Sequence, residues 1–510
     1  MLAIVNGCAV YGMDGYLVKV EVDVSSGLPA FDIVGLPDAS VKESKERVRA
    51  AIRNSGFEFP LRRITVNLAP ADIRKEGSLL DLPIAIGILA ATAQVPESDL
   101  LKQSAIVGEL SLDGAVRSIS GALAMASSLN HEKDISYFFL PQENAAEASI
   151  VPSISACPVA SLTDIVEMFK EEKEIRREMV DIKSIFEATE EDDAYDMSDV
   201  KGQEGVKRAL EIAAAGGHNI LLIGAPGSGK TMLARRLPSI LPPLTLNESM
   251  EVTKLYSIAG ILPRHKPLIT RRPFRAPHHG ASSASIIGGG TNPRPGEISL
   301  ASHGVLFMDE MPEFSRDVLE ALRQPLEDRV VTVSRVNARI TFPAHFQLVG
   351  ALNPCPCGYY GDTLKECTCT PHMIQKYLGR ISGPLWDRID LHIDVPRIKY
   401  GEISSTKAGE SSEQIKKRVE AARAIQAERF ASLGINCNAQ IRRRDIQKLC
   451  ALTPEGEEML GEAFRRLQLS ARAHDRILKV ARTIADLEGQ EKIALEHIAE
   501  AIQYRNMERN

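Results

Sequence analysis

The spacing of apolar and polar residues divides the chain into regions that predict different structures. Through residues 1–168, short β-branched runs alternate with turn residues and with stretches of helical spacing. The predicted strands are Val18–Val24, Ile64–Pro70 and Ser104–Gly114, and the predicted helices are Val41–Gly56 and Leu82–Gln94. This mixture predicts a first domain of the α+β or α/β type, and we expect α+β.

The next segment, residues 169–199, is strongly acidic. Between Glu171 and Val200 twelve acids face four bases, and the run Glu190–Asp193 is wholly acidic. A segment with so few large apolar residues cannot bury a core of its own, so we interpret it as a solvated linker. An exposed pair of acidic helices is the alternative interpretation.

Residues 200–398 alternate apolar strand patterns with helical patterns, which predicts a parallel sheet with helices on both faces. In residues 399–510 the apolar residues recur every three to four positions. We therefore expect a central α/β domain followed by an all-α C-terminal domain. The fold class of the whole chain is α/β.

Composition narrows the class of protein. The 510 residues are 44% hydrophobic and 25% charged, with a net charge of -6, which is ordinary for globular domains and excludes a uniformly basic nucleic-acid coat. The longest apolar stretch, near Leu82–Val95, is shorter than the roughly 20 residues of a membrane-spanning helix. The first residues lack the pattern of a secretory signal, so we expect no membrane partner and a cytoplasmic location.

The strongest chemical signal is a glycine-rich loop between a strand pattern and a helix pattern. The loop consists of Gly224, Ala225, Pro226, Gly227, Ser228, Gly229, Lys230 and Thr231. In such a loop the backbone N–H groups surround phosphate oxygens, the lysine reaches the terminal phosphates and the threonine hydroxyl holds Mg²⁺. We therefore predict a nucleotide site in which Lys230 and Thr231 have those roles.

Two further apolar runs end in polar residues that suit phosphoryl transfer. One ends in Asp309 and Glu310, and these carboxylates can hold Mg²⁺ and activate a water molecule. The other ends in Asn353, whose amide can orient the attacking water. The alternative for Asn353 is a cap on the turn before Pro354.

Arg388 lies among apolar residues after these runs. A guanidinium at that place can neutralise the charge that develops in the transition state of phosphoryl transfer. The alternative is a structural ion pair with Asp387 or Asp390.

These motifs, in this order, carry a family resemblance. The sequence resembles AAA+ ATPases in five features: the phosphate loop, the strand ending in Asp309 and Glu310, the strand ending in Asn353, Arg388 and the later segment Ser470–Arg476. Within that class it resembles the helix-2-insert group, which includes magnesium-chelatase motors and minichromosome-maintenance helicases. Arg272–His279 and Gly288–Ser299 resemble the corresponding segments of the magnesium-chelatase-like ComM/YifB family. The resemblance extends over essentially the whole chain.

The resemblance implies cofactors and roles for individual residues. ATP and Mg²⁺ are the implied cofactors, with Asp309 as a magnesium ligand, Glu310 as the catalytic base and Asn353 as the first sensor. Arg388 becomes a finger inserted into the site of a neighbouring subunit. Such a head-to-tail contact closes into a ring, for which the resemblance implies a hexamer. Arg472 best matches the second sensor, and Arg476, one helical turn later, remains open.

Two basic segments are candidates for contact with DNA. Residues 252–296 contain seven bases and no acid, and within them we select Arg271, Arg272, Arg275, His278 and His279. The alternative is that these residues belong to a solvated loop or hold a subunit interface together.

A second DNA candidate is the alternating run Val330–Val349. Its pattern predicts a hairpin with Asn337 near the turn and with Arg335 and Arg339 beside it. In the helicase relatives that the resemblance brings in, a hairpin at this place contacts DNA in the pore. The alternative is that the arginines keep an exposed edge soluble.

The first domain resembles the fold of Lon-type proteases, through the segments Gly108–Leu123 and Leu140–Ala148. A Ser-Lys hydrolase needs a nucleophile and an amine base within hydrogen-bonding distance. The resemblance aligns the catalytic positions with Leu79 and Leu123, and Ser78 is one residue away from the serine position. We therefore expect no proteolysis and interpret the domain as a collar for the ring or for nucleic acid.

Four of the eight cysteines lie close together in the sequence. Cys355, Cys357, Cys367 and Cys369 form two C-x-C pairs, and four thiolates at this spacing can close on Zn²⁺. We predict a structural zinc site with His372 as a spare ligand, and reduced cysteines in a loop as the alternative.

Together these features predict an ATP-driven ring motor that translocates on single-stranded or branched DNA. The family resemblance implies branch migration of joint DNA molecules during natural transformation. The alternative is a chelatase-type or protein-remodelling motor that uses the same ATPase site on a protein partner. A non-catalytic DNA-binding scaffold is disfavoured because Lys230, Asp309 and Glu310 are all present.

Overall fold

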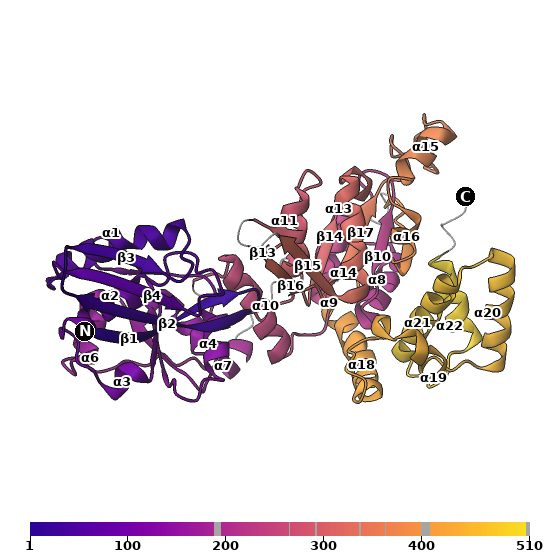
Figure 1. Cartoon of the computed structure of the whole chain (residues 1–510). Coiled ribbons are helices and arrows are strands. Elements are labelled where there is room, and N and C mark those ends of the chain that lie inside the picture. Colours follow the sequence, from indigo (N-terminus) through magenta and orange to yellow (C-terminus); the bar gives the residue numbers. More distant parts are fainter. Residues whose placement is uncertain are drawn as a thin grey trace. The chain divides into compact units, whose positions relative to one another are not determined.

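Residues 1–187, 195–264, 266–290, 293–335, 338–362, 364–398 and 409–505 are described by a computed structural model. The chain forms two structural units, and each unit is discontinuous in sequence (Figure 1). Met1–Thr189 and Leu246–Thr270 make the first unit, whereas Glu190–Thr245 and Arg271–Asn510 make the second. The run Glu190–Asp193 lies outside the described residues.

The first unit is built on a mixed sheet with the strand order β3-β4-β2-β1-β5-β8-β9. Its strands are β1 (Leu2–Tyr11), β2 (Asp14–Ser25), β3 (Ala30–Val34), β4 (Arg63–Ala69), β5 (Ser104–Ile106), β8 (Tyr137–Pro141) and β9 (Ser155–Val159). β2 pairs antiparallel with β1 and β4, and alternate residues from Val18 to Val24 are buried on one face. The strands predicted at Val18–Val24 and Ile64–Pro70 are thus confirmed.

Helices cover this sheet and share its hydrophobic core with the strands. They are α1 (Ala39–Asn54), α2 (Asp81–Ala91), α3 (Asp99–Lys102), α4 (Ala122–Leu129), α5 (Gln142–Ala148), α6 (Leu162–Phe169) and α7 (Ile182–Glu187). Every residue of α2 is buried, which explains why the longest apolar stretch of the chain lies there. Both helices predicted in this region are confirmed as α1 and α2.

The predicted strand Ser104–Gly114 is wrong as a single element. The structure divides it into β5 and β6 (Glu109–Leu110), and β6 pairs with β7 (Val116–Arg117) in a separate small sheet. Gly108 stands at the break, where a Cβ atom would come within 2.7 Å of Val116 Cγ1. The chain turns out of the large sheet at this close approach, which β-branched content alone does not reveal.

Helix α10 (Leu246–Ala259) belongs to the first unit although it follows the phosphate loop in sequence. Its buried residues Val252, Leu255 and Ile258 recur every three positions, and the helix packs against α4. The Gly121 N–H donates to the Ser257 carbonyl at 3.1 Å and to the Ser257 hydroxyl at 3.0 Å. The segment therefore completes the hydrophobic core of the first unit.

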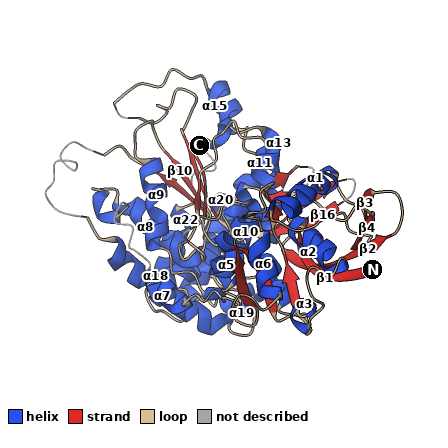
Figure 2. Cartoon of the chain, turned by 90° about the vertical axis from the view of Figure 1, so that its left-hand side faces the viewer, coloured by secondary structure: helices blue, strands red, loops and turns tan. Residues whose placement is uncertain are grey.

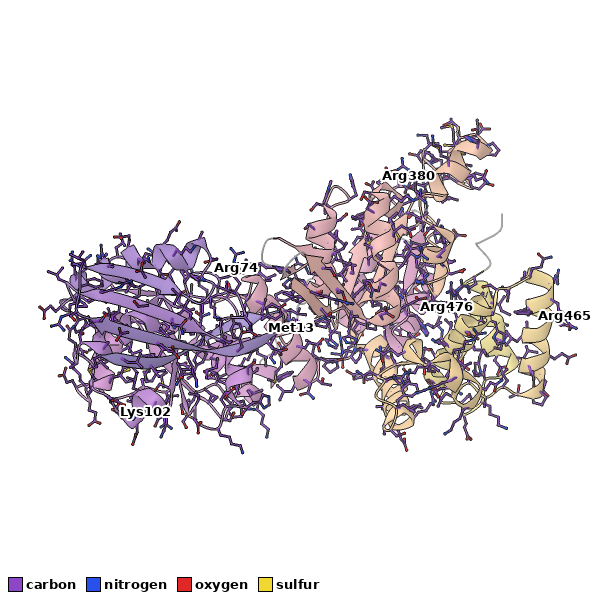
Figure 3. All side chains as sticks on the ribbon, viewed as in Figure 1. Met13, Arg74, Lys102, Arg380, Arg465 and Arg476 are labelled. Atoms are coloured by element: carbon purple, nitrogen blue, oxygen red, sulfur yellow. The ribbon has the colours of Figure 1, made fainter. Side chains whose placement is uncertain are left out.

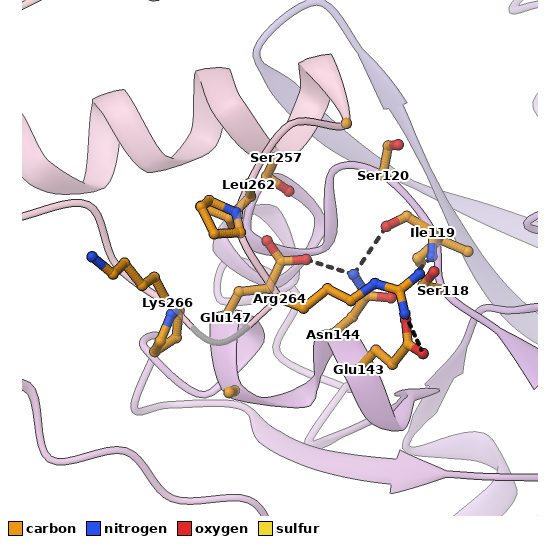
Figure 4. A pocket seen from close by; sticks show the side chains of 14 residues that line it. Ser118, Ile119, Ser120, Glu143, Asn144, Glu147, Ser257, Leu262, Arg264 and Lys266 are labelled. Carbon is orange, nitrogen blue, oxygen red and sulfur yellow. Dashed lines mark hydrogen bonds and ion pairs between the residues drawn. The ribbon is translucent and has the colours of Figure 1, made fainter. Parts of the chain in front are cut away.

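Residues from both parts of the first unit also line a polar cavity of about 200 Å³. Figure 4 shows Arg264 against Glu143, with Nη1 and Oε1 3.2 Å apart. In the same view Asn144 donates to Glu147 Oε1 at 2.8 Å and to the Ile119 carbonyl at 2.9 Å. The Arg264 contact attaches the loop after α10 to α5.

The second unit contains a parallel sheet with the order β11-β14-β17-β10-β18. Its central strands β14, β17 and β10 are labelled in Figure 1. Its strands are β10 (Ile220–Ile223), β11 (Phe274–Arg275), β14 (Val305–Met308), β17 (Gln347–Leu352) and β18 (Leu391–Asp394). β10, β14 and β17 are buried throughout, as expected for parallel strands covered on both faces. The predicted α/β region with a parallel sheet is confirmed.

Helices flank this sheet (Figure 2), and α8 packs against β18 while α9 packs against β14 and β17. The helices of this region are α8 (Glu204–Gly216), α9 (Lys230–Ile240), α11 (Ser283–Ile287), α12 (Glu297–Leu300), α13 (Arg316–Ala321), α14 (Arg323–Asp328), α15 (Pro371–Leu378) and α16 (Gly383–Trp386). Two small antiparallel ribbons accompany them, β12 (Gly288–Gly289) with β13 (Arg294–Pro295), and β15 (Val330–Arg335) with β16 (Ala338–Pro343).

The C-terminal region of the second unit is helical, as predicted. Its helices are α18 (Ser412–Phe430), α19 (Ile446–Leu449), α20 (Pro454–Leu467), α21 (Ala471–Leu487) and α22 (Leu495–Gln503). Buried residues of these helices share one hydrophobic core with α8, α9 and β10. The helical region and the sheet are therefore packed together within one unit. Among the described residues, the structure contains no helix long and apolar enough to cross a membrane.

Candidate nucleotide site

The phosphate loop connects the buried strand β10 to helix α9. Gly227 and Gly229 have φ angles of +77° and +92°, a left-handed region that side chains with a Cβ atom rarely adopt. At Gly224 a Cβ atom would come within 2.6 Å of the Val395 carbonyl oxygen. The glycines thus allow a tight loop at the start of a helix, where backbone N–H groups can face a bound anion.

Lys230 lies inside this loop and is only 9% exposed. Its Nζ donates to the carbonyl oxygens of Gly224 and Ala225 at 2.7 and 3.1 Å, and to Asn353 Oδ1 at 3.2 Å. Burial lowers the pKa of Lys230, and the carboxylates of Asp309 and Glu310 oppose that shift. The ammonium group therefore lies among oxygens where a phosphate can take their place.

The carboxylates at the end of β14 lie next to Thr231. The Thr231 hydroxyl donates to Asp309 Oδ2 at 2.8 Å, and Asp309 Oδ1 accepts from the Glu310 N–H at 2.9 Å. A hydroxyl and a carboxylate oxygen at hydrogen-bonding distance can both serve as ligands of one Mg²⁺ ion. Glu310 itself has a φ of +50°, and its side chain is 55% exposed.

Parallel strand order explains why these residues meet. β17 lies between β10 and β14, so the carboxyl ends of the three strands are adjacent. Asp309 follows β14, Asn353 follows β17, and Lys230 follows β10 and the phosphate loop. The hydrogen bond from Lys230 to Asn353 connects the ends of β10 and β17. The structure thus brings together the residues that the sequence predicted separately.

Gln203 is a residue of this site that sequence reasoning missed. It precedes α8 with a φ of +58°, and its Nε2 donates to the Ser228 carbonyl at 2.9 Å and to the Pro396 carbonyl at 2.7 Å. In the part of the chain that the structure describes, Gln203 Oε1 and Ser228 Oγ are buried without a hydrogen-bond partner. Unpaired polar atoms beside a phosphate loop fit a polar ligand such as a nucleotide.

Arg388 is buried and forms an ion pair within its own chain. Its Nη2 lies 2.6 Å from Glu327 Oε1, and its Nη1 donates to the Pro384 carbonyl at 2.7 Å. The partner is therefore Glu327 on α14, rather than Asp387 or Asp390. The role of Arg388 in a neighbouring subunit stays a prediction.

The two candidates for the second sensor differ in environment. Arg472 is exposed in the first turn of α21, whereas Arg476, labelled in Figure 3, forms an ion pair with Asp390. Asp390 also accepts from the Asn219 N–H at 3.0 Å and lies 3.6 Å from His218 Nδ1. Burial opposes the charge of Asp390, yet Arg476 and His218 hold its pKa well below its usual range.

Two of the arginines selected for DNA contact are engaged in local structure. Arg272 donates to the carbonyl oxygens of Pro242, His303 and Pro243 at 2.5 to 3.0 Å. Arg275 binds Glu297 through two hydrogen bonds of 2.7 Å. These bonds hold both arginines within the fold of the second unit. Contact with DNA stays a prediction for both residues and for Arg271.

The histidines of the same segment lie beside the predicted catalytic carboxylate. The rings of His278 and His279 are 4.1 Å apart, and His279 Nδ1 lies 3.6 Å from Glu310 Oε2. No motif in the sequence indicates this neighbour, because the two residues are about 30 positions apart. The contact links the basic segment after β11 directly to the predicted catalytic base.

The predicted hairpin is confirmed as β15 and β16. Val330 is opposite Pro343 and Arg335 is opposite Ala338. Arg339 is exposed on β16, while Asn337 and the side chain of Arg335 lie outside the described residues.

In the first unit, the positions that the Lon resemblance aligns with catalytic residues are aliphatic. Leu123 is fully buried in α4, and Leu79 packs against the same core. The Ser78 hydroxyl donates to a carboxylate oxygen of Glu109. The buried Lys75 donates to the Ile73 carbonyl at 2.8 Å.

The four clustered cysteines converge in space. The sulfur atoms of Cys355, Cys357, Cys367 and Cys369 all lie within 4.8 Å of one another, and three of the separations are 3.3 to 3.7 Å. Four sulfurs around a tetrahedral zinc ion are about 3.8 Å apart, because the Zn–S distance is about 2.3 Å. The donor set therefore fits Zn²⁺.

The parallel sheet, the phosphate loop and the adjacent carboxylates define a nucleotide-binding site of the AAA+ class. The family description "Magnesium chelatase, subunit ChlI" matches residues 196–403, "Subunit ChlI of Mg-chelatase" matches 20–144, and "Magnesium chelatase, subunit ChlI C-terminal" matches 409–505.

Whole-chain relatives identify the family more closely. The chain is 45% identical over 510 residues to "Competence protein ComM" of Haemophilus influenzae, covering 100% of this chain and 98% of that protein. It is 44% identical over 509 residues to YifB of Escherichia coli, with 100% and 98% coverage. It also matches "Lon protease 2" of Bacillus subtilis at 26% identity over 187 residues, 33% of each chain. The chain belongs to the ComM/YifB family of magnesium-chelatase-like AAA+ proteins.

Proposed function

We propose that this protein is an ATP-hydrolysing motor that moves along DNA and drives branch migration during the uptake of DNA in natural transformation. The observation that carries the proposal is the contact between His279 and Glu310, because it joins a basic segment to the proposed catalytic carboxylate. The relative named as a competence protein supports the biological setting.

The residues of the site have definite tasks in this proposal. Backbone N–H groups of residues 224–229 and the Lys230 ammonium bind the ATP phosphates, and Thr231 with Asp309 holds Mg²⁺, which neutralises charge on the phosphates when bound. Glu310 takes a proton from the attacking water, and Asn353 orients that water. Arg272, Arg275 and the hairpin arginines are the proposed DNA contacts, and the first two must leave their present partners to make them.

The proposed assembly is a ring, with a hexamer as the expected size. Arg388 is the proposed finger, and leaving Glu327 is the change that it requires to reach a neighbouring site. The proposed second sensor is Arg472, because its guanidinium is exposed at the start of α21 whereas Arg476 is paired with Asp390.

The test compares the wild type with Glu310→Gln, using purified protein, ATP and a four-way DNA junction. We expect DNA to stimulate hydrolysis in the wild type, and the variant to lose roughly a hundredfold or more in rate while it still binds ATP. Strand movement is followed by fluorescence, and the assembly by mass measurement with ATP. If DNA neither stimulates hydrolysis nor moves, the proposal fails, and a chelatase-type motor acting on a protein takes its place.

We also propose that Cys355, Cys357, Cys367 and Cys369 bind one structural Zn²⁺ ion. The sulfur separations and the N–H groups directed at the sulfurs support this assignment. Elemental analysis of the purified protein tests it, with about one zinc per chain expected.

A further inference from the structure

The cysteine loop, residues 355–362 and 364–369, packs closely against the phosphate loop. Gly358 has a φ of +87°, and a Cβ atom there would lie 2.6 Å from Pro226 Cδ and 2.7 Å from Pro226 Cγ. The Gly358 N–H donates to the Cys355 carbonyl at 2.9 Å, which closes the turn that presents the glycine to the proline. Only a residue without a side chain fits between the two loops.

A second connection reaches the phosphate loop from another direction. Asp362 Oδ2 lies 2.8 Å from Arg397 Nε, and the Asp362 side chain is only 3% exposed. Arg397 follows Pro396, whose carbonyl accepts from Gln203 Nε2, and the same amide donates to the Ser228 carbonyl. The cysteine loop is thus connected to the phosphate loop near Ser228 as well as at Pro226.

A third connection runs through the first-sensor residue. Asn353 accepts from Lys230 and lies two residues before Cys355, which is fully buried. The Cys355 sulfur in turn accepts from the Tyr360 N–H at 3.3 Å. The position of the asparagine amide therefore depends on how firmly Cys355 is held.

We propose that the cysteine loop is a positioning element of the nucleotide site, in which four thiolates gathered on Zn²⁺ hold Gly358 against Pro226 and so keep the phosphate loop in the form that binds ATP. This inference rests on the proposed zinc site. The two cysteine pairs lie at the two ends of a polar loop, and bringing these ends together costs conformational entropy. A metal ion bound by all four thiolates offsets that cost because it cross-links the two ends. When the metal is lost, Gly358 is no longer held against Pro226, and the phosphate loop loses this contact.

The chain offers a matched pair of glycines for the test. Gly361 has a φ of +75°, similar to that of Gly358, but a Cβ atom there would meet nothing within 4 Å. Gly358→Ala and Gly361→Ala therefore share the cost of a left-handed alanine, and only the former pushes on Pro226. Both full-length variants are titrated with a fluorescent ATP analogue carrying an N-methylanthraniloyl group, and their zinc content is measured.

We expect Gly358→Ala to bind the analogue about tenfold more weakly with unchanged zinc content, and Gly361→Ala to bind like the wild type. Combining Gly358→Ala with Pro226→Ala removes the ring carbons that clash, so this double variant should bind more tightly than Gly358→Ala alone. Equal affinities of the two glycine variants, or a double variant that binds no more tightly than Gly358→Ala alone, would overturn the proposal.

Removal of zinc from the wild-type chain separates this inference from the proposals on which it rests. We expect a chelator to weaken binding of the analogue and added Zn²⁺ to restore it. A purified chain with far less than one zinc overturns the metal site and the inference together. Zinc that can be removed without change in affinity overturns the positioning role alone, and DNA-stimulated hydrolysis tests the motor function independently of both.

Discussion

Asp390 shows how a single buried charge can hold two parts of the second unit together. It lies just before β18, and its carboxylate is shared by Arg476 of α21, by His218 and by the Asn219 N–H before β10. Burial lowers the pKa of His218, so the imidazole is neutral at pH 7 and the net pair is that of Asp390 with Arg476. The helical region is thereby joined to the parallel sheet.

Asp390→Asn should destabilise the chain by about 2–3 kcal/mol at pH 7, less than a fully buried pair because Arg476 retains some solvent contact. The Asp390 pKa is lowered in the folded state, so its contribution is complete above the pKa of an unfolded aspartate, about 3.9, and is lost as the pH falls below it. Urea unfolding at several pH values should show a constant difference from the wild type above about pH 5 and a smaller one below about pH 4.

Asp387→Asn is the matched control, because Asp387 lies three residues away and is only half-buried. It should change stability by less than about 0.5 kcal/mol at any pH. Equal effects of the two substitutions would show that the Asp390 pair does not hold the helical region.

At the scale of elements, β11 and the segment after it connect the edge of the parallel sheet to the proposed catalytic base. Phe274 is opposite Val305 in the parallel pairing of β11 with β14, and Arg275 fixes the strand to α12 through Glu297. His279 then lies beside Glu310. A change in this short segment therefore reaches the carboxylate directly.

His279→Ala should alter the ratio of ATP hydrolysis with and without DNA by several-fold, because it removes the neighbour of Glu310. His278→Ala is the control, since the His278 ring lies against His279 and makes no contact with Glu310 among the described interactions. It should change the DNA concentration needed for stimulation while leaving the ratio at saturating DNA unchanged. Steady-state hydrolysis over a DNA titration measures both, and identical ratios in both variants would contradict the link.

The elements that carry the site were predictable because their signals are local. Apolar runs ending in Asp309 and Asn353 predict buried parallel strands, and the glycines of residues 224–229 predict a phosphate loop. The contacts of Gln203 and Gly358 were not predictable, because their partners Ser228 and Pro226 are distant in sequence. The broken strand at Gly108 has a related origin, since the close approach of another side chain decides it.

At the scale of the whole molecule, the basic stretch 252–296 is divided between the two structural units. Lys254, Arg264 and Lys266 belong to the first unit, whereas the later bases belong to the second. Linear charge patterns cannot reveal such a division, because it depends on which core buries α10. The predicted central domain, residues 200–398, includes α10, whereas the structure places this helix in the first unit.

Leu255→Ala should therefore weaken the first unit, by about 2–5 kcal/mol, because it removes a fully buried side chain from the helix that packs on α4. Hydrogen exchange of the full-length protein should become faster in α4 and stay unchanged in β10 and β17. Ile261→Ala is the control, since Ile261 is 44% exposed. Loss of protection in β10 rather than α4 would contradict the assignment of α10 to the first unit.

The discontinuous first unit has a consequence for biosynthesis. After a ribosome has added Thr189, it must still synthesise the chain as far as Thr270. Only then is the segment Leu246–Thr270 available to complete the core beside α4. At about 5–20 residues per second, that interval lasts roughly 4 to 16 s. During this interval the apolar surface beside α4 remains exposed, because α10, which covers it, has not yet been synthesised. We therefore expect this protein to depend most on chaperones during this interval.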